Sequence, residues 1–463
     1  MESISKDSIK MYAIFLKFLI LALCIAQFSC EETEKRIDIS HEFPFTSEHW
    51  TVENADGTEA EITIKEFKGK PGIALKASQI AYLKSGDFKN FEMEFYCNGA
   101  YPGLGFRIQD KKNYEYLYLR VPSSTKKDAL QYIPIYKGSL PWQLYNYPQY
   151  EGKATFPFQT VGAFPTRIAD ELIDGKLNQK LLDQFTEQAI SLSSEAEVIR
   201  GEESSGYIFD PQDSTALLFD KVNERIEFSD FRTWIHIKLE VVEDEMSVYV
   251  EDMETPSFIV TNLKRNTASG GISLISDFGE VYFRKVQIAE LEEAKDTGTK
   301  VSSVALSKNY LTQWQLSEMF TKDTINFVAQ LDSVLVNGKF KSIEADDDAL
   351  VNISRFYDDM TKTVVLRHTL ESDADRQVRL NFDYADHLAI FLNSEVLFDK
   401  GMDFQPPSTK GMEGRVFVDD EEVSLNLKKG QNTLCFMLSA DNRQKFNWGV
   451  IAKLESLKGI TSR

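Results

Sequence analysis

The stretch Ile235-His236-Ile237-Lys238-Leu239-Glu240-Val241 alternates apolar and polar side chains without a break, and this alternation decides the fold class. Successive side chains of a β-strand point to opposite faces, so the stretch has one apolar face and one polar face. The same alternation recurs in short segments between turn residues, at 61–64, 91–95, 114–121, 247–250 and 281–283. Many short strands of this kind predict an all-β protein built from antiparallel sandwiches.

Length and composition narrow the choice of protein class. The chain has 463 residues, which predicts two to four domains at about 100–200 residues each. Its 52 Lys and Arg against 72 Asp and Glu give a formal charge of −20, which argues against a nucleic-acid partner. Only 5 His and 4 Cys argue against a Cys/His metal site or a disulfide framework. The excess of 32 Phe and 18 Tyr is the one positive hint of function.

One segment breaks the β pattern. Between Arg167 and Ile190 apolar residues recur at helical spacing, which predicts an amphipathic helix inside an insertion at about 150–225. The polar stretch 293–304 has no periodicity and is the predicted linker. The expected organisation is therefore a first sandwich over 31–292 with one helical insertion, and a second over 305–463.

The N-terminus is typical of an export signal. Residues 1–29 combine lysines with the apolar run Phe18 to Ala26, and either Met1 or Met11 is the start. Lys17 interrupts the apolar residues and leaves a run too short to span a bilayer. Phe28-Ser29-Cys30 resembles the lipobox of lipoproteins of the Bacteroidetes type, which implies lipidation at Cys30 and a place on the outer membrane.

The acidic run Glu31-Glu32-Thr33-Glu34 resembles the stretch that sends such lipoproteins to the cell surface. The resemblance implies that a lipid anchor is the only membrane contact, with envelope proteins as further partners. The alternative is ordinary cleavage of the signal and a free secreted protein. Cys97 and Cys435 lie in separate predicted domains, so each is expected to be a small buried residue rather than half of a disulfide.

Several motifs of the first block follow a recognisable order. Gly103-Leu104-Gly105-Phe106-Arg107 precedes a turn and the aromatic strand Tyr114 to Arg120, and Trp234 to Val241 precedes Gly270 to Leu274 and Tyr282 to Val286. This order resembles the concanavalin A-like lectin/glucanase sandwich, in particular the laminin-G-like and 3-keto-disaccharide-hydrolase-like modules. The resemblance implies a jelly-roll β-sandwich and a carbohydrate ligand.

The second block carries another set of motifs. Trp314-Gln315-Leu316-Ser317 opens it, Asp386 to Asn393 follows, and Leu425 to Leu434 leads to Trp448-Gly449. This pattern resembles the galactose-binding-like jelly roll appended to many bacterial glycosidases. Ser394 stands where the family pattern has a turn Gly. Such a domain either binds sugar or docks onto its neighbour.

Catalysis of glycoside hydrolysis would need two carboxylates at a defined separation. The glucanases of the first family use two acids on one strand, about 5–5.5 Å apart in retaining enzymes. Glu92 and Glu94 share a strand face, but the family's E-x-D-x-E arrangement is missing, and the pair is expected to lie on the solvated face of an edge or outer strand. No catalytic residue is therefore assigned.

Aromatic residues are the better candidates for a ligand site. Sugars present apolar C–H faces that pack on flat rings, while their hydroxyls pair with groups such as the Arg107 guanidinium. The predicted ligand-binding residues are Arg107, Tyr114, Tyr116, Tyr118, Tyr132, Trp142, Tyr145 and Tyr147. The alternative is that the strand tyrosines pack in the core or across strands.

Two acidic runs, Glu344 to Asp348 and Asp419 to Glu422, are interpreted as solvated loops. No cofactor or metal is assigned, and Ca²⁺ is the one ion that such runs would suit. The sequence thus predicts a lipid-anchored surface protein that binds glycan or polysaccharide without catalysis. The alternatives are a glycoside hydrolase acting in the first sandwich and a structural subunit of a polysaccharide-utilisation assembly.

Overall fold

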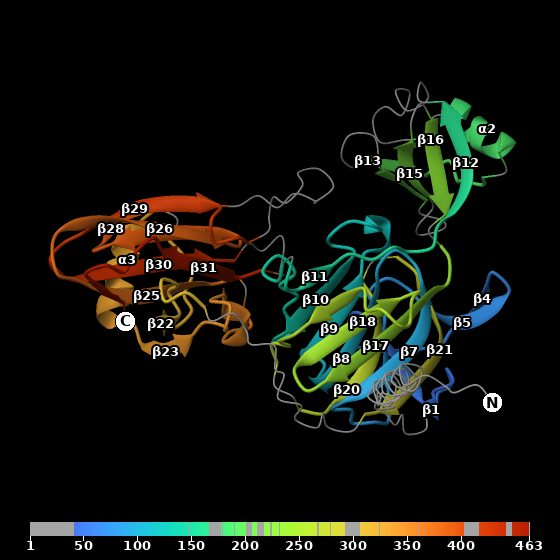
Figure 1. Cartoon of the computed structure of the whole chain (residues 1–463), viewed down its shortest axis with the longest axis horizontal. Coiled ribbons are helices and arrows are strands. Elements are labelled where there is room, and N and C mark those ends of the chain that lie inside the picture. Colours follow the sequence, from blue (N-terminus) through green and yellow to red (C-terminus); the bar gives the residue numbers. More distant parts are fainter. Residues whose placement is uncertain are drawn as a thin grey trace, which may run out of the picture. The chain divides into compact units, whose positions relative to one another are not determined.

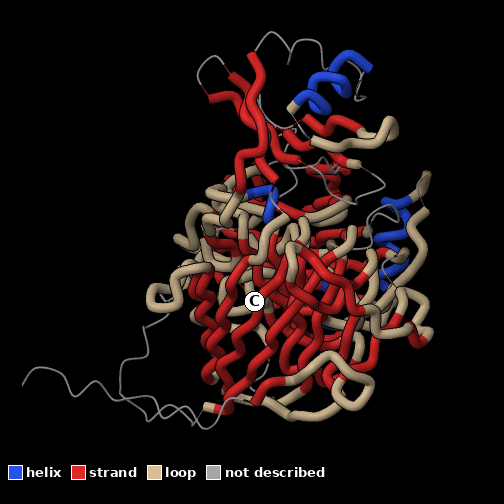
Figure 2. The backbone as a smooth tube through the Cα atoms, turned by 90° about the vertical axis from the view of Figure 1, so that its right-hand side faces the viewer, coloured by secondary structure: helices blue, strands red, loops and turns tan. Residues whose placement is uncertain are grey.

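The structure is a computed structural model, and almost all of its regular elements are strands (Figures 1 and 2). It describes residues 41–462 except 147, 166–176, 178, 189, 201–205, 211–216, 223–224, 231, 266–267, 278, 292–305, 324, 360, 402–415 and 441–446. The expected all-β class is therefore confirmed. In this described part of the chain, no helix has the length and hydropathy that a membrane span requires. The signal segment, Cys30 and the linker 293–304 lie outside the described residues.

The N-terminal sandwich consists of two antiparallel eight-stranded sheets. The first, named here the β7 sheet, has the order β19-β18-β17-β7-β21-β5-β4, with β1 also paired to β21. Its strands are β1 (His41–Glu42), β4 (Ile64–Phe67), β5 (Lys70–Leu75), β7 (Phe91–Asn98), β17 (Ile235–Val242), β18 (Glu245–Val250), β19 (Phe258–Val260) and β21 (Val281–Glu290).

The second sheet of this sandwich, named the β9 sheet, has the order β11-β10-β9-β8-β20-β6-β2-β3. Its strands are β2 (Trp50–Glu53), β3 (Glu59–Ala60), β6 (Ile80–Leu83), β8 (Pro102–Asp110), β9 (Asn113–Leu119), β10 (Leu130–Ile135), β11 (Glu151–Gly152) and β20 (Gly271–Ser276). A short 3₁₀ helix, η1 (Val121–Ser123), follows β9.

The alternating stretch 235–241 lies in β17. Ile235, Ile237 and Leu239 are fully buried, while the residues between them are half-buried. β17 pairs with β7, where Phe91, Met93 and Phe95 are buried in the same alternating pattern. The apolar faces of the two sheets thus form one core.

The insertion contains more strand than the sequence suggests. The helix is present as α2 (Gln179–Glu187), but it accompanies a five-stranded sheet of order β12-β16-β15-β14-β13. These strands are β12 (Gln159–Pro165), β13 (Glu197–Arg200), β14 (Gly206–Phe209), β15 (Leu217–Val222) and β16 (Arg225–Asp230). The expected helix is present, and the insertion also contains these strands, which were not predicted from the sequence. Phe185 of α2 packs edge-on against Phe164 and Phe228 of the sheet.

The C-terminal sandwich pairs a seven-stranded sheet, β23-β22-β25-β30-β27-β28 with β32 on β25, with a four-stranded sheet, β24-β31-β26-β29. The strands are β22 (Gln313–Ser317), β23 (Phe340–Glu344), β24 (Val351–Asn352), β25 (Thr363–Ser372), β26 (Arg376–Tyr384), β27 (His387–Leu392), β28 (Glu395–Gly401), β29 (Glu421–Leu427), β30 (Gly430–Ser439), β31 (Gly449–Leu454) and β32 (Ile460–Ser462). Two helical elements accompany them, α3 (Phe327–Asn337) and the 3₁₀ helix η3 (Ile353–Arg355).

The turn between β27 and β28 accommodates Ser394 in place of Gly. Asn393 and Ser394 both have positive φ, 51° and 68°, as a two-residue hairpin turn requires. The Asn393 side-chain carbonyl accepts a 2.8 Å hydrogen bond from the Thr433 N–H, which holds the turn against β30. Cys435 and Cys97 are buried free thiols, as the sequence predicts.

Candidate ligand-binding site

Two of the predicted ligand residues face the interior of the N-terminal sandwich. The Arg107 side chain is buried and donates from Nε and Nη2 to the Lys89 carbonyl at 2.9 and 2.7 Å. Tyr132 is fully buried, and its hydroxyl donates to Glu115 at 2.7 Å. The expectation that these two side chains are available at the surface is therefore wrong, because both serve the polar interior of the sandwich.

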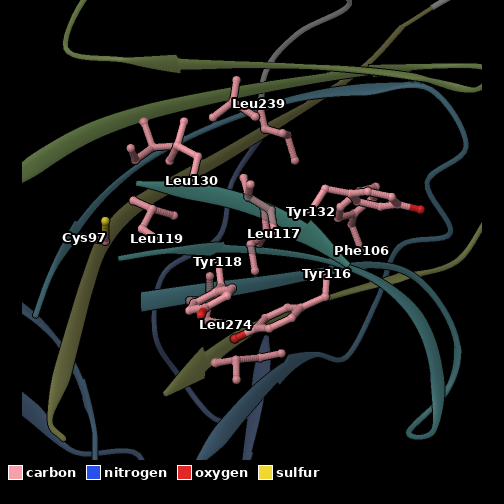
Figure 3. Close-up of a cluster of buried hydrophobic side chains, with 14 of the residues drawn as sticks. Cys97, Phe106, Tyr116, Leu117, Tyr118, Leu119, Leu130, Tyr132, Leu239 and Leu274 are labelled. Carbon is pink, nitrogen blue, oxygen red and sulfur yellow. The ribbon is translucent and has the colours of Figure 1, made fainter. Parts of the chain in front are cut away.

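The tyrosines of β9 lie on the opposite side of the strand from that interior. Tyr116 and Tyr118 are stacked with their centroids 5.8 Å apart and their planes 4° apart. Figure 3 shows their rings side by side, away from Leu119 and Leu130. Tyr116 and Tyr118 are buried and Tyr114 is half-buried, so packing accounts for most of this ladder.

Two glycines of β8 let these rings lie close to the sheet. Gly103 of β8 is the register partner of Tyr118, and Gly105 is the partner of Tyr116. A Cβ atom on Gly103 would lie 2.3 Å from the Tyr116 hydroxyl oxygen, which no side chain tolerates. The two glycines of the Gly103-Leu104-Gly105 motif therefore make room for the tyrosines.

Asp277 is the polar group at one end of this face. It follows β20 directly, and the Tyr116 hydroxyl donates a hydrogen bond to its carboxyl. Burial raises the pKa of Asp277 to about 6 against the opposing effect of that hydrogen bond. Tyr82 lies half-buried on β6, the strand next to β20, where it pairs in register with Ser273. Neither Asp277 nor Tyr82 belongs to a sequence motif, and only the position of Asp277 directly after a strand could have drawn attention to it.

Arg120 organises the other end. Its guanidinium carbon lies 4.6 Å from the Tyr118 ring centre and 5.8 Å from that of Trp142. It also donates to the Gln131 side chain and pairs with Glu151 at 3.3 Å. The Trp142 side chain is half-buried. The Gln131 side-chain amide donates to the backbone carbonyl of Trp142 at 2.7 Å, which holds this loop against β10.

We name this set of residues on the outer face of the β9 sheet the tyrosine strip. It comprises Tyr82, Tyr114, Tyr116, Tyr118, Arg120, Trp142 and Asp277. Three of its rings are partly exposed, and a carboxyl and a guanidinium lie among them. Such a strip can pack against the C–H faces of a sugar and pair with its hydroxyls.

The other predicted ligand tyrosine of this loop has a different role. Tyr145 is fully buried, and its hydroxyl lies 3.4 Å from Asp346 and accepts from Asn352 at 3.2 Å. Tyr150 follows the same pattern and donates to Asp348 at 2.5 Å. The expectation that Tyr145 is exposed is wrong, because the 346–348 acidic run covers it. Tyr147 lies outside the described residues.

The acidic run 344–348 is therefore not a solvated loop. Asp346 is buried and pairs with Arg355, and Asp347 accepts from Lys264 and Asn262. The second run fits the expectation better: Glu421 pairs with Lys400 at 3.0 Å and the exposed Glu422 pairs with Arg379 at 3.1 Å. Within the residues described, no group of three or more His, Cys, Asp or Glu side chains is arranged to hold a metal ion.

The carboxylates that could suggest catalysis are on the other sheet. Glu92 and Glu94 share the outer face of β7, where Glu94 lies 2.7 Å from His236. At the Arg120 end of the tyrosine strip, Glu151 pairs with Arg120 at 3.3 Å, and at the other end the Asp277 carboxyl accepts from the Tyr116 hydroxyl. Among its defining residues, the strip therefore contains one carboxyl, that of Asp277.

No protein-family model and no curated protein matches this chain. Among solved structures, it is similar to a carbohydrate-binding module, CBM66, from Bacillus subtilis, with 14% identity over 53% of this chain and 100% of that one, at a TM-score of 0.27. A putative glycosyl hydrolase from Parabacteroides distasonis matches with 11% identity over 54% of this chain and 100% of that one, at a TM-score of 0.25. Domains LG4-5 of the mouse laminin α1 chain match with 10% identity over 94% and 98% of the two chains, at a TM-score of 0.19. Likenesses this distant carry no information about ligand or activity.

Proposed function

We propose that this protein binds glycan through the tyrosine strip and has no catalytic activity of its own. The observation that carries the proposal is the grouping of three partly exposed rings, Tyr82, Tyr114 and Trp142, with Asp277 and Arg120 on one sheet face. The lipid anchor at Cys30 and the outer-membrane location belong to the same proposal, with the export signal as their support.

Binding to a glycan array tests the proposal. Replacing a stacking ring removes about 1 kcal/mol or more, so Tyr114→Ala and Trp142→Ala should each weaken binding by about tenfold. Tyr310→Ala is the matched control, because Tyr310 is a half-buried ring of the second block that packs under Lys453. Equal binding by all three variants and the unmodified chain would reject the strip as the site.

A glycoside hydrolase is the second candidate, and the raised pKa of Asp277 is the observation in its favour. A carboxyl with a pKa of about 6 is suited to donate a proton to a leaving oxygen. Hydrolysis of a polysaccharide panel that disappears in Asp277→Asn, while binding persists, would establish this function instead. Binding without turnover supports the non-catalytic function, and neither binding nor turnover would leave a structural subunit as the remaining function.

A further inference from the structure

A second aromatic and cationic cluster lies on the outer face of the β7 sheet, on strands that run side by side in Figure 1. His236 on β17, Tyr96 on β7 and Arg284 on β21 are direct neighbours in the strand register. All three are half-buried and alternate with core residues, so their side chains point outward. Together with Trp234 they form what we name the Arg284 clamp.

The guanidinium of Arg284 lies close to two aromatic rings. Its central carbon is 5.0 Å from the ring centre of Tyr96 and 5.3 Å from that of Trp234. A cation at this distance from a ring is attracted to its face. Such contacts hold the guanidinium plane without using its N–H groups.

Neighbouring residues fix both rings. The Trp234 indole N–H donates to the Phe67 carbonyl at 3.1 Å, and the edge of the indole lies over Gly72, where a Cβ atom would come within 3.0 Å of it. Tyr96 is stacked on His236 with centroids 4.4 Å apart and planes 6° apart. His236 in turn lies 2.7 Å from the Glu94 carboxylate. The clamp is therefore held in place before any ligand arrives.

The N–H donors of Arg284 have no acceptor among the described residues, although the chain carries 72 acidic side chains. Three other arginines of this sandwich each have an acceptor: Arg107 binds the Lys89 carbonyl, Arg120 pairs with Glu151, and Arg265 binds the Ile135 carbonyl. Guanidinium groups match planar carboxylates and other oxyanions with two parallel hydrogen bonds. A fixed guanidinium with free donors beside two rings has the chemistry of a site for an anionic group carried on a sugar ring.

We propose that the Arg284 clamp binds the carboxylate or sulfate group of an acidic polysaccharide, with Trp234 and Tyr96 contacting the sugar that carries it. This site lies on the opposite sheet from the tyrosine strip and does not depend on it. Carboxylate and sulfate both present oxyanion oxygens to the guanidinium, and probes that carry one group or the other distinguish between them.

The test is binding of the full chain to polygalacturonate, which carries carboxylates, to dextran sulfate, and to uncharged dextran, at low salt. Arg284→Gln should weaken binding to the preferred anionic probe at least tenfold, and Arg284→Lys should recover only part of it, because an ammonium keeps the charge but loses the fork. Arg367→Gln is the matched control, since the Arg367 guanidinium lies over a single ring, that of Phe340, at 4.2 Å. Binding to uncharged dextran should not respond to Arg284→Gln.

A second readout guards against a misfolded variant. Ligand binding at the clamp should change the tryptophan fluorescence of the unmodified chain, and Trp234→Phe should remove that change. The thermal unfolding midpoints of Arg284→Lys and Arg284→Gln show separately whether these two variants are folded. Equal weakening by Arg284→Gln and Arg367→Gln would show a general charge effect and overturn the proposal. So would the absence of binding to either anionic probe, or a fluorescence change that persists in Trp234→Phe.

Discussion

The hydroxyl of Tyr132 donates a 2.7 Å hydrogen bond to the carboxyl of Glu115 inside the N-terminal sandwich. The same hydroxyl accepts from the Lys264 N–H at 2.7 Å, and Glu115 accepts from the Arg265 N–H at 3.1 Å. These bonds tie β9, β10 and the 263–265 segment together. Complete burial nevertheless raises the pKa of Glu115 to about 7, because desolvation outweighs the hydrogen bonds that favour the charged form.

This carboxyl should make stability fall as pH rises. The folded pKa of Glu115 is about 7 and its ordinary value is 4.5, so its contribution is present below pH 4.5 and is lost as pH rises through 7. The loss is at most about 3 kcal/mol. Glu115→Gln should therefore gain stability relative to the unmodified chain between pH 5 and pH 8, measured as the urea midpoint at each pH. A difference between the two chains that stays constant with pH would show that Glu115 does not titrate in this range.

His368 should act in the opposite direction. It is buried, its Nδ1–H donates to the Gln313 carbonyl at 2.6 Å, and its Nε2 accepts from the Ser462 hydroxyl at 2.7 Å. Burial lowers the pKa of His368 below its ordinary value of 6.5, so the stability it contributes is present above pH 6.5 and is lost as pH falls through the lower folded pKa.

His368→Leu should remove the loss of stability at acid pH. At pH 7 it should lower the free energy of unfolding by about 1–3 kcal/mol, because the Gln313 carbonyl and the Ser462 hydroxyl lose a partner. The measurement is chemical unfolding at pH 7 and pH 5. His387→Leu is a useful comparison, since the His387 ring is half-buried and faces Lys322 and Asp399 rather than a backbone carbonyl. If His368→Leu loses as much unfolding free energy between pH 7 and pH 5 as the unmodified chain does, a group other than His368 causes that loss.

The sequence predicts the sheets well because their signal is local. The alternation of β7 and β17 specifies which side chains enter the core, and both strands are found where the pattern places them. It also predicts that Glu92 and Glu94 share an outward face, which the register confirms. The Gly103-Leu104-Gly105 motif is present because tyrosines from the next strand lie over it, a reason that no pattern within one strand can contain.

The exposure of the aromatic residues could not be predicted in the same way. Tyr132 lies between Gln131 and Ile133, so its neighbours in the sequence do not show which way its ring points, and its hydrogen-bond partner Glu115 lies on another strand. Tyr145 is covered by Asp346, which lies two hundred residues away in the sequence. A loop rich in Tyr and Pro has no periodicity that would reveal such a cover.

Lys264 should be a stabilising residue, unlike the exposed lysines. Its side chain is only 4% exposed, and its ammonium pairs with Asp347 and, at 3.4 Å, with Asp348. Lys264→Met should cost about 1–3 kcal/mol, because it leaves two carboxylates without their cation. Lys65→Met is the matched control: Lys65 pairs with Glu280 at 2.6 Å but is 44% exposed, so its loss should cost less than about 1 kcal/mol. Thermal unfolding of the two variants separates these outcomes, and equal shifts would mean that the Lys264 pair is worth no more than a surface pair.

Gly449 should tolerate no side chain, because two neighbours occupy the space beside it. A Cβ atom would lie 2.7 Å from the Leu144 Cδ1 and 2.8 Å from the Val351 carbonyl oxygen. Leu144 could rotate away, but the carbonyl belongs to β24, which pairs with β31 at that point. Gly449→Ala should therefore destabilise the chain by about 1–3 kcal/mol through overpacking. Gly271→Ala is the control, since its nearest neighbour would be the Ile108 Cβ at an ordinary 3.7 Å, and its unfolding midpoint should barely change. If Leu144→Ala combined with Gly449→Ala restores only part of the loss, the remainder is the strain against the Val351 carbonyl, whereas full recovery would make Leu144 the whole obstacle.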